Sequence, residues 1–597
     1  MRSMPPDSRR GAWRGVGYYA GICLVALLLG IWVLGLAGNL ASVPITYTDD
    51  GIAASVGVKG IIENGHAYSN AWLGAPDAAE YFDFPNADAS SIATIWLISR
   101  FVRNYVAVLN LFALLTYPLI AAAAAWSLRR LGMSGPVAAV CALLYALLPF
   151  HQSRVTFHLF LSAYFVVPLV IALVADVVLR PSGAAVTGRR WLGLPLWSWG
   201  VVLLMGTCGM YYAYFGLVLV VLAGMIAAYR DRTWRALLPA LVVVVGVVVL
   251  LALQMAPSYA YWANEGRNNT GDSRQPVESD FFGLRLTQLV YPMDDHRIAR
   301  FAQAKQFLHD SLEMISPSMA FIAYDSSLGV VGALGLLVLG FWALTAPFRA
   351  PPGGAHGTPG KLALLGVASF LLGTVGGVGS VIAFLGFPQI RAYDRITVYV
   401  AFASIAAVAW VADVFVARVV RGGWSGARRV AVAIGLALLL VVGVLDQTNP
   451  AAVAPDYDEI SAVFDSDAAF VSDVESALPD DSLVFQLPYV TYPEGPAPEG
   501  TGVYDPLRLY LHSATLHWSA GAFAGREAAT WQAETTELDV DAMLARLAEE
   551  GFAGLTVDRR GYDDGGRELE AEIASALGDR DPVESPDGRY AFFVLEK

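Results

Sequence analysis

The sequence is poor in cysteine and in charged residues. Its 597 residues include three cysteines, Cys23, Cys141 and Cys208, and all three lie in apolar runs. This excludes a disulfide framework and a cysteine-rich metal site. Charged residues make up 15% of the chain, whereas soluble domains contain about 25%. Apolar runs of about 20 residues, the length that spans a bilayer, recur along the chain. A soluble enzyme, a disordered protein and a fibrous repeat are therefore excluded.

A strongly basic region is also missing, and the acidic residues are unevenly distributed. Residues 446–597 contain 9 Lys and Arg but 31 Asp and Glu, a net charge of −22. Residues 1–445 contain 30 Lys and Arg and 21 Asp and Glu, a net charge of +9. Without a basic patch, nothing indicates a nucleic-acid partner. The contrast predicts a membrane body, residues 1–446, and a soluble acidic domain, residues 447–597.

The membrane body is predicted to be a polytopic α-helical bundle of about 11 transmembrane helices. The first apolar run could be read as a cleaved signal peptide, but it is longer than the apolar core of one, which favours a retained helix. The run at 90–103 is too short to cross and contains two arginines, which favours a helix lying at the interface. The predicted spans are roughly 15–38, 105–128, 134–150, 159–179, 195–210, 212–229, 236–256, 329–347, 361–380, 396–417 and 429–446.

Lys and Arg near the span ends predict the orientation of the body. With the N-terminus in the cytoplasm, every inner loop has at least two basic residues, and the opposite loops are longer and more acidic. An odd number of spans then places the C-terminal domain outside, together with two long loops, 39–104 and 257–328. Long loops without obvious structure are usually functional, so we expect chemistry at the outer surface of the membrane.

The C-terminal domain is predicted to be a small α/β fold. Three segments with helical periodicity alternate with three short apolar runs that are typical of strands. The helical segments are 468–478, 540–551 and 567–578, and the strand runs are 482–489, 552–558 and 590–596. Repeated helix–strand units favour a partly parallel sheet. Since no glycine-rich phosphate loop precedes these helices, a nucleotide site is not expected here.

Two adjacent carboxylates, Asp49 and Asp50, follow the first span. Burial beside the membrane and a like-charged neighbour both raise the pKa of a carboxylate, which suits one of the pair to act as a general base. We favour Asp50 as the base because Gly51 allows the backbone to turn. Asp49 would then hold an acceptor hydroxyl or a cation. The alternative is that both are solvated loop acids.

This arrangement resembles the GT-C superfamily of polytopic membrane glycosyltransferases, in which one span is followed by an acidic outer loop with an interfacial helix. The stretches YFDFPNADASS, LPFHQSRVTFHLFLSAYFVVPL and FPQIRAYDRITV also resemble a bacterial branch often labelled membrane glycosyltransferase or sugar translocase. The resemblance implies a bundle of about this size with a soluble C-terminal domain, inversion at the sugar carbon, and a catalytic acid at Asp49 or Asp50. The Trp-Trp-Asp motif of oligosaccharyltransferases is absent, which argues against transfer to asparagine.

The resemblance further implies a hexosyl- or pentosyltransferase of glycan biosynthesis in the cell envelope. Its donor would be a polyprenyl-phosphate sugar, its acceptor an extracytoplasmic glycan or a lipid-linked molecule, and its location, among membrane lipids, the bacterial cell (inner) membrane. A transporter or flippase of a lipid-linked sugar is the alternative, although mid-span charges and internal repeats, which transporters often have, are scarce. A non-catalytic anchor for the tail domain would not need so many spans.

A leaving polyprenyl phosphate needs cations beside it, and arginine binds phosphate oxygens bidentately. Two clusters on the outer side qualify. His151, Arg154 and His158 lie between spans three and four, and Arg391 and Arg395 precede span ten. The last two are four residues apart and share a face if the helix begins there. Arginines that anchor span ends at the interface are the alternative interpretation.

The outer loop 257–328 holds a third candidate cluster. His296 and Arg297 are candidates for contact with the donor phosphate. Asp294, Asp295 and His296 could also hold a divalent cation through oxygen and imidazole ligands, although their spacing is no known metal motif. The alternative is the solvated start of an amphipathic interfacial helix. No other cofactor is indicated.

The tail domain contains a group of aromatic residues between 485 and 531. Flat rings can form a platform for the C–H faces of a sugar, which makes Tyr489, Trp518 and Trp531 candidates for acceptor binding. Packing of the core of a small domain explains such residues equally well.

Overall fold

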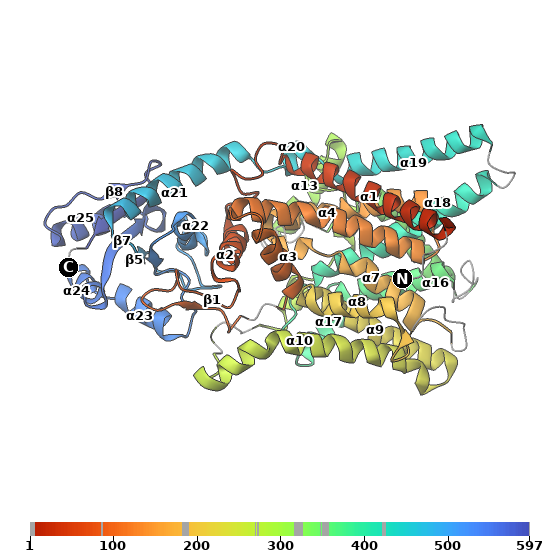
Figure 1. Cartoon of the computed structure of the whole chain (residues 1–597), viewed down its shortest axis with the longest axis horizontal. Coiled ribbons are helices and arrows are strands. Elements are labelled where there is room, and N and C mark those ends of the chain that lie inside the picture. The colour runs from red at the N-terminus through yellow and green to blue at the C-terminus, as the bar shows by residue number, and fades with distance from the viewer. Residues whose placement is uncertain are drawn as a thin grey trace.

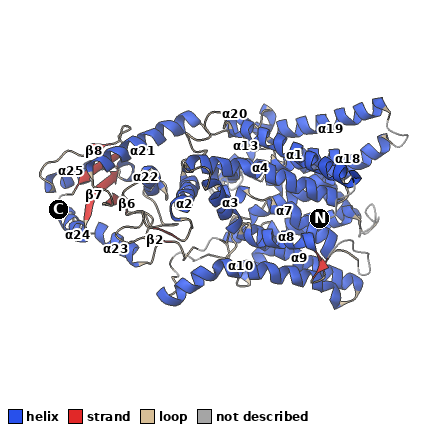
Figure 2. Ribbon diagram, viewed as in Figure 1, coloured by secondary structure: helices blue, strands red, loops and turns tan. Residues whose placement is uncertain are grey.

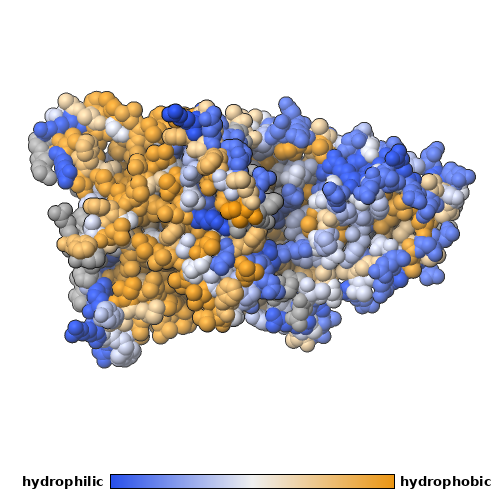
Figure 3. Space-filling model, turned by 180° about the vertical axis from the view of Figure 1, so that it is seen from behind, coloured by the Kyte–Doolittle hydropathy of each residue, from blue (hydrophilic) through white to orange (hydrophobic). Residues whose placement is uncertain are grey.

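The computed structural model describes residues 6–595 except 85–86, 182–189, 269, 271–273, 316–325, 347, 349–356 and 421–424. The molecule is elongated, with a helical body that contains the N-terminal part of the chain and a tail domain that extends from one end of the body (Figure 1). The larger sheet lies in the tail (Figure 2). On the face that Figure 3 shows, hydrophobic residues cover most of the body and hydrophilic residues cover most of the tail.

Long apolar helices dominate the body because hydrocarbon offers the backbone no hydrogen-bond partners outside the helix itself. The long helices are α1 (Pro6–Leu34), α4 (Tyr105–Arg130), α9 (Met210–Asp231), α10 (Leu238–Glu265), α18 (Thr397–Val419) and α19 (Gly426–Gln447). The shorter ones are α8 (Leu196–Thr207), α15 (Gly329–Thr345), α16 (Thr358–Gly373) and α17 (Val378–Phe384). A short hairpin of β3 (Arg190–Trp191) and β4 (Leu194–Pro195) precedes α8.

Seven helices among the described residues are long and apolar enough to cross a membrane, when 135–157 is counted as one helix. They coincide with seven of the eleven predicted spans, and they make the chain an integral membrane protein. The other four predicted spans, 159–179, 195–210, 329–347 and 361–380, overlap apolar helices of 10–17 residues. The number of crossings therefore stays a prediction.

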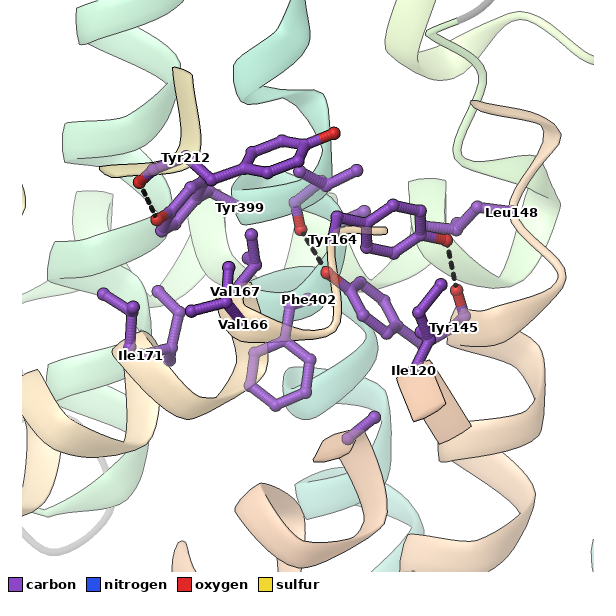
Figure 4. Packing of buried hydrophobic residues seen from close by; sticks show 14 of the residues in the cluster. Ile120, Tyr145, Leu148, Tyr164, Val166, Val167, Ile171, Tyr212, Tyr399 and Phe402 are labelled. Carbon is purple, nitrogen blue, oxygen red and sulfur yellow. Dashed lines mark hydrogen bonds between the residues drawn. The ribbon is translucent and has the colours of Figure 1, made fainter. Parts of the chain in front are cut away.

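The segment after α4 is a series of short helices, and buried tyrosines satisfy the backbone at its breaks. The series comprises α5 (Gly135–Ala146), α6 (Pro149–Phe157), the 3₁₀ turn η1 (Leu159–Ser162), α7 (Val166–Leu173) and the π turn η2 (Val174–Val178). Helix ends leave carbonyl groups without intrahelical partners. The Tyr164 hydroxyl donates to the carbonyl of Tyr145 at 3.1 Å (Figure 4), and the Tyr212 hydroxyl donates to that of Leu161 in η1. This segment can therefore bend within the core.

The first predicted outer segment, residues 39–104, contains two helices, and the second of them lies where a helix was predicted at 90–103. Its helices are α2 (Asp49–Asn64) and α3 (Ala89–Ser99), joined through β1 (Ser69–Asn70) and β2 (Ala79–Glu80). α2 lies between the body and the tail, in contact with α4 and α6 on one side and with α22 (Arg508–His512) and the 3₁₀ turn η5 (Asp505–Leu507) on the other. Lys59 of α2 is buried and donates to the carbonyls of Tyr510 and Ser513, at 2.5 Å each. The tail thus holds α2 in place.

The second predicted outer segment, residues 257–328, also contains helices. These are α11 (Glu278–Phe281), α12 (Leu286–Val290) and α13 (Ala299–Glu313). After it, the 3₁₀ turn η4 (Tyr393–Ile396) leads into α18.

The tail domain contains a five-stranded mixed sheet in the order β6-β5-β7-β9-β8. β5 is parallel to β6 and β7, and β9 is antiparallel to β7 and β8. Three strands lie at the predicted places, and the edge strands β6 and β8 were not predicted because each has only two residues. The strands are β5 (Leu483–Leu487), β6 (His517–Trp518), β7 (Phe552–Asp558), β8 (Val583–Glu584) and β9 (Tyr590–Val594); the helices are α20 (Pro450–Val453), α21 (Tyr457–Ala477), α23 (Glu527–Thr536), α24 (Val540–Glu550) and α25 (Arg567–Ala576).

Candidate active site

The acidic pair forms the first turn of α2, at the end of the body that faces the tail. Thr48 is the N-cap, and carboxylates in a first turn are stabilised by the helix dipole. Asp49 has a φ of 44°, a conformation that Asp and Asn adopt more readily than most residues. The expected turn at Gly51 is therefore wrong, because the turn is at Asp49. Gly51 is needed for close packing, since a Cβ there would collide with Thr46.

Asp50 lies beside basic side chains of the body. Its Oδ2 is 3.3 Å from Nε2 of His158, and its side chain is 45% exposed. Burial raises the pKa of Asp50 above its ordinary value, against the opposing charges of Arg395 and Arg154. An accessible carboxylate with a raised proton affinity is suited to take a proton from an incoming hydroxyl.

Asp49 faces the tail domain. A Cβ on Gly502 would lie 3.4 Å from Oδ1 of Asp49 and 3.4 Å from Oδ1 of Asp505, so these residues are immediate neighbours. Burial, followed by the Asp505 carboxylate, raises the pKa of Asp49. Arg589, the residue before β9, donates to the carboxylate of Asp505 at 2.8 Å. The tail therefore contributes a wall to the site.

Arg154 connects α6 to the segment before α18. Its Nη2 donates to Oδ2 of Asp394 at 3.3 Å, and its Nη1 is 3.1 Å from Nδ1 of His158. Arg154 is 5% exposed. A buried guanidinium with a carboxylate partner keeps a fixed direction, so Asp394 orients Arg154 toward His158.

Arg391 and Arg395 lie on the same side of the site. The helix begins at Tyr393, as η4, so Arg391 precedes it and the condition for a shared α-helical face is not met. Arg395 stacks over the ring of Tyr211 at 4.2 Å. Arg391 is 3.3 Å from a carboxylate oxygen of Glu278 and 3.3 Å from one of Glu494. These separations are longer than the 2.7–2.9 Å that is common for charge-assisted bonds.

Glu494, which the sequence analysis missed, joins the tail to these arginines. It lies in the Pro- and Gly-rich segment after β5 and forms a bidentate pair with Arg274, at 2.8 and 2.9 Å. Tyr504 follows in the same segment, and burial and then the charge of Asp50 raise its pKa. A turn-rich segment directly after a parallel strand is a usual position for site residues, and this was the available signal.

His151 lies apart from the charged cluster. It is fully buried, its Nε2 is 3.1 Å from Oγ1 of Thr116, and it packs edge-on against Tyr117 with ring centroids 4.2 Å apart. A phosphate cannot reach a histidine in this position. The structure therefore corrects the expected role of His151 to one in the core.

His296 and Arg297 bind the end of α19. Nε2 of His296 is 3.4 Å from Oδ1 of Asp446, and the Arg297 guanidinium donates to the carbonyls of Leu445 and Thr448 at 2.8–3.0 Å. Cations near the last carbonyls of a helix stabilise that helix. These contacts explain the positions of both side chains without a bound phosphate.

The side chains of the Asp294, Asp295 and His296 cluster go to different partners. Asp294 is 2.9 Å from Nε2 of His309, whereas His296 pairs with Asp446. Among the described residues, no three His, Cys, Asp or Glu side chains form a group that could hold a metal ion. The described residues of this cluster therefore do not fit a divalent cation.

The three candidate aromatic residues of the tail differ in exposure. Trp518 is fully buried in the core of the tail, and Trp531 stacks on Phe552 with ring centroids 5.7 Å apart. The burial of Trp518 corrects the expectation for that residue, whereas Trp531 is half-buried and stays a candidate for acceptor contact. Tyr489 is half-buried beside Pro488 and Thr491, and it stays a candidate for acceptor contact.

Asp88 is the N-cap of α3, with its carboxylate accepting from the Ser91 amide at 3.3 Å, and it is 5% exposed. Burial raises the pKa of Asp88 to about 7, although hydrogen bonds from Ser91 act against this. A folded-state pKa above the unfolded one gives stability that is full at low pH and is lost as the pH rises through 7. The wild-type protein is therefore expected to have a lower melting temperature at pH 8.5 than at pH 5.5.

Asp88→Asn should reduce this difference, since asparagine caps a helix without a charge. Asp77→Asn, at an exposed position before the same helix, is the matched control and should behave like wild type. Thermal unfolding in detergent at both pH values measures the effect. An Asp88→Asn protein with an unchanged pH dependence would contradict the assignment.

No family model and no curated protein sequence matches the chain. In structure, 98% of the chain is similar to 75% of the archaeal oligosaccharyltransferase AglB from Archaeoglobus fulgidus, solved with an inhibitory peptide and a dolichol-phosphate, at 12% identity and a TM-score of 0.46. Likewise, 97% of the chain is similar to 40% of the arabinofuranosyltransferase AftD from Mycobacteria, at 14% identity and a TM-score of 0.46.

A third solved structure is that of ArnT from Cupriavidus metallidurans in the apo state. There, 98% of the chain is similar to 98% of the other chain, at 14% identity and a TM-score of 0.44. These neighbours are GT-C fold glycosyltransferases. With TM-scores below 0.5, the likeness by itself assigns neither an activity nor a substrate.

Proposed function

We propose that the protein is a glycosyltransferase that moves a sugar from a polyprenyl-phosphate donor to an extracytoplasmic glycan or a lipid-linked acceptor. The observation that carries the proposal is the meeting of four segments: the acidic pair on α2, Arg154 and His158 at the end of α6, Arg391 and Arg395 at η4, and the tail segment around Glu494. An acid pair that faces arginines at the end of an apolar body fits a base opposite a phosphate-binding wall.

An apolar groove in the body supports a lipid donor. It has a volume of about 990 Å³ and is lined by α9, α15, α16 and α17. Tyr214 lies at this groove, and its hydroxyl is 2.9 Å from that of Tyr393, which lies between Arg391 and Arg395 in the chain. A polyprenyl chain in the groove would therefore bring its phosphate toward the two arginines.

The proposed reaction is a single displacement. The acceptor hydroxyl oxygen attacks the anomeric carbon and passes its proton to Asp50. The bond between that carbon and the phosphate oxygen breaks, and its electron pair leaves with the polyprenyl phosphate. Arg391 and Arg395 stabilise the charge that develops on the phosphate. Asp49 and Tyr504 lie where they can hold the acceptor.

We also propose that the site faces the outside of a bacterial inner membrane, with the N-terminus in the cytoplasm. The support is the excess of basic residues in the short loops on the opposite side. α2 and the tail contribute to one site, so they share one side of the membrane.

Transfer from a panel of radiolabelled polyprenyl-phosphate sugars by the purified, reconstituted protein tests the function. We expect one donor of the panel to label a glycan or lipid-linked acceptor, with nucleotide sugars as the negative control. If no donor is consumed while intact lipid-linked sugar crosses the bilayer, the transporter alternative replaces the proposal.

A further inference from the structure

A continuous chain of polar contacts leads to Asp50 from inside the body. Asp394 accepts from Nη2 of Arg154 at 3.3 Å, Nη1 of Arg154 is 3.1 Å from Nδ1 of His158, and Nε2 of His158 is 3.3 Å from Oδ2 of Asp50. Arg154 is buried, and about a third of the His158 side chain is exposed. The last residue of the chain is the one that we propose as the base.

This geometry determines which ring nitrogen of His158 carries a proton. A guanidinium has only donors, so Arg154 must donate to Nδ1, and Nδ1 must be unprotonated. The proton of the neutral ring is then on Nε2, the atom nearest Asp50. The separation of 3.3 Å is short enough for this contact to tighten into a hydrogen bond, as catalytic contacts often do once a substrate is bound.

The surroundings keep His158 neutral. The charged groups that face it are Asp50 from α2, Arg154 from α6, and Arg391 and Arg395 beside η4. Burial and then the three arginine charges lower the pKa of His158 to about 2. A neutral histidine offers a phosphate no net charge, and this departs from the role that the sequence suggested.

We propose that His158 is a positioning residue: it presents Nε2–H to Oδ2 of Asp50, so that Oδ1 is directed to the acceptor hydroxyl. Asp394 and Arg154 set its tautomer from behind. The inference rests on the proposed glycosyl transfer for its kinetic part, but the tautomer and charge of His158 do not depend on that activity.

Kinetics separate positioning from phosphate binding. A donor to a carboxylate favours its ionised form, so His158→Leu is expected to move the acidic limb of the pH profile of kcat/KM to higher pH. It should also lower kcat by roughly 10- to 100-fold, the range found when partners that orient metal-ligating side chains are lost, with little change in KM for the lipid donor. His158→Gln, whose amide can donate, should restore part of kcat. A raised donor KM with an unmoved acidic limb in both variants would overturn the proposal.

A spectroscopic test uses the full-length protein in detergent. Nitrogen-15 NMR with labelled histidine, assigned by His158→Gln, is expected to show a neutral ring protonated on Nε2 from pH 5 to pH 8, with a signal that shifts in Asp50→Asn. The exposed His66, identified through His66→Gln, is the control, and its signal should be unchanged in Asp50→Asn. A His158 that is charged at pH 5, or protonated on Nδ1 when neutral, would overturn the inference. An inactive wild-type protein that shows the expected signal would instead count against the proposed function alone.

Discussion

Asp50→Asn is expected to lower the rate of sugar transfer by about 10²–10⁴-fold, the usual cost of losing a general base, with near-normal expression and thermal stability. The change removes a charge from a partly exposed site and is nearly isosteric, so a large folding penalty is not expected. Initial rates at saturating donor and acceptor measure the effect. In the wild type, the rate should rise with pH as Asp50 ionises, with a limb above the ordinary carboxylate range because burial raises its pKa.

Asp49→Asn is the companion variant and is also expected to reduce transfer strongly. Asparagine tolerates the positive φ at this position, so lost activity would report on the carboxylate and not on the backbone. Asp77→Asn, exposed and in the same outer segment, is the matched control; Asp88 is unsuitable because it is buried. Full activity of both Asp49→Asn and Asp50→Asn would remove the proposed mechanism.

Arg391→Ala and Arg395→Ala are expected to raise KM for the lipid donor by about 10- to 100-fold each, because a hydrogen bond to a charged group contributes about 1.5–3 kcal/mol. Arg391→Lys should restore only part of this, since lysine lacks the bidentate fork. Donor titrations with purified protein measure the effect. Arg395 also opposes the raised pKa of Asp50, so Arg395→Ala should additionally move the acidic limb to higher pH.

Arg300→Ala is the matched control. Arg300 is exposed on α13 of the second outer segment, and its loss should leave donor KM unchanged. If both alanine variants at Arg391 and Arg395 kept wild-type donor kinetics, these arginines would be interfacial anchors only.

The sequence was sufficient to predict the elements whose signals are local. Long apolar runs predict helices because hydrocarbon forces the backbone to form its hydrogen bonds within the helix. Short apolar runs that alternate with helical segments predicted the three main strands of the tail. The acidic pair could be noticed because it is the first pair of adjacent carboxylates after the first span of a body with few charges. α2 was missed because its glycines and β-branched residues weaken the helical signal, and its stability depends on contacts with the tail.

The site itself was decided by the tertiary structure. Local sequence shows residue types, and only packing shows which of them meet. His151 and His158 are seven residues apart, yet one is sealed in the core and the other faces Asp50. Glu494 lies more than a hundred residues from Arg391 in the chain and contacts it across two domains. The sequence alone determined that this is a membrane protein with an acidic tail, because hydropathy and charge are properties of composition. The structure decided which charges act together, because electrostatic interactions depend on distance and burial.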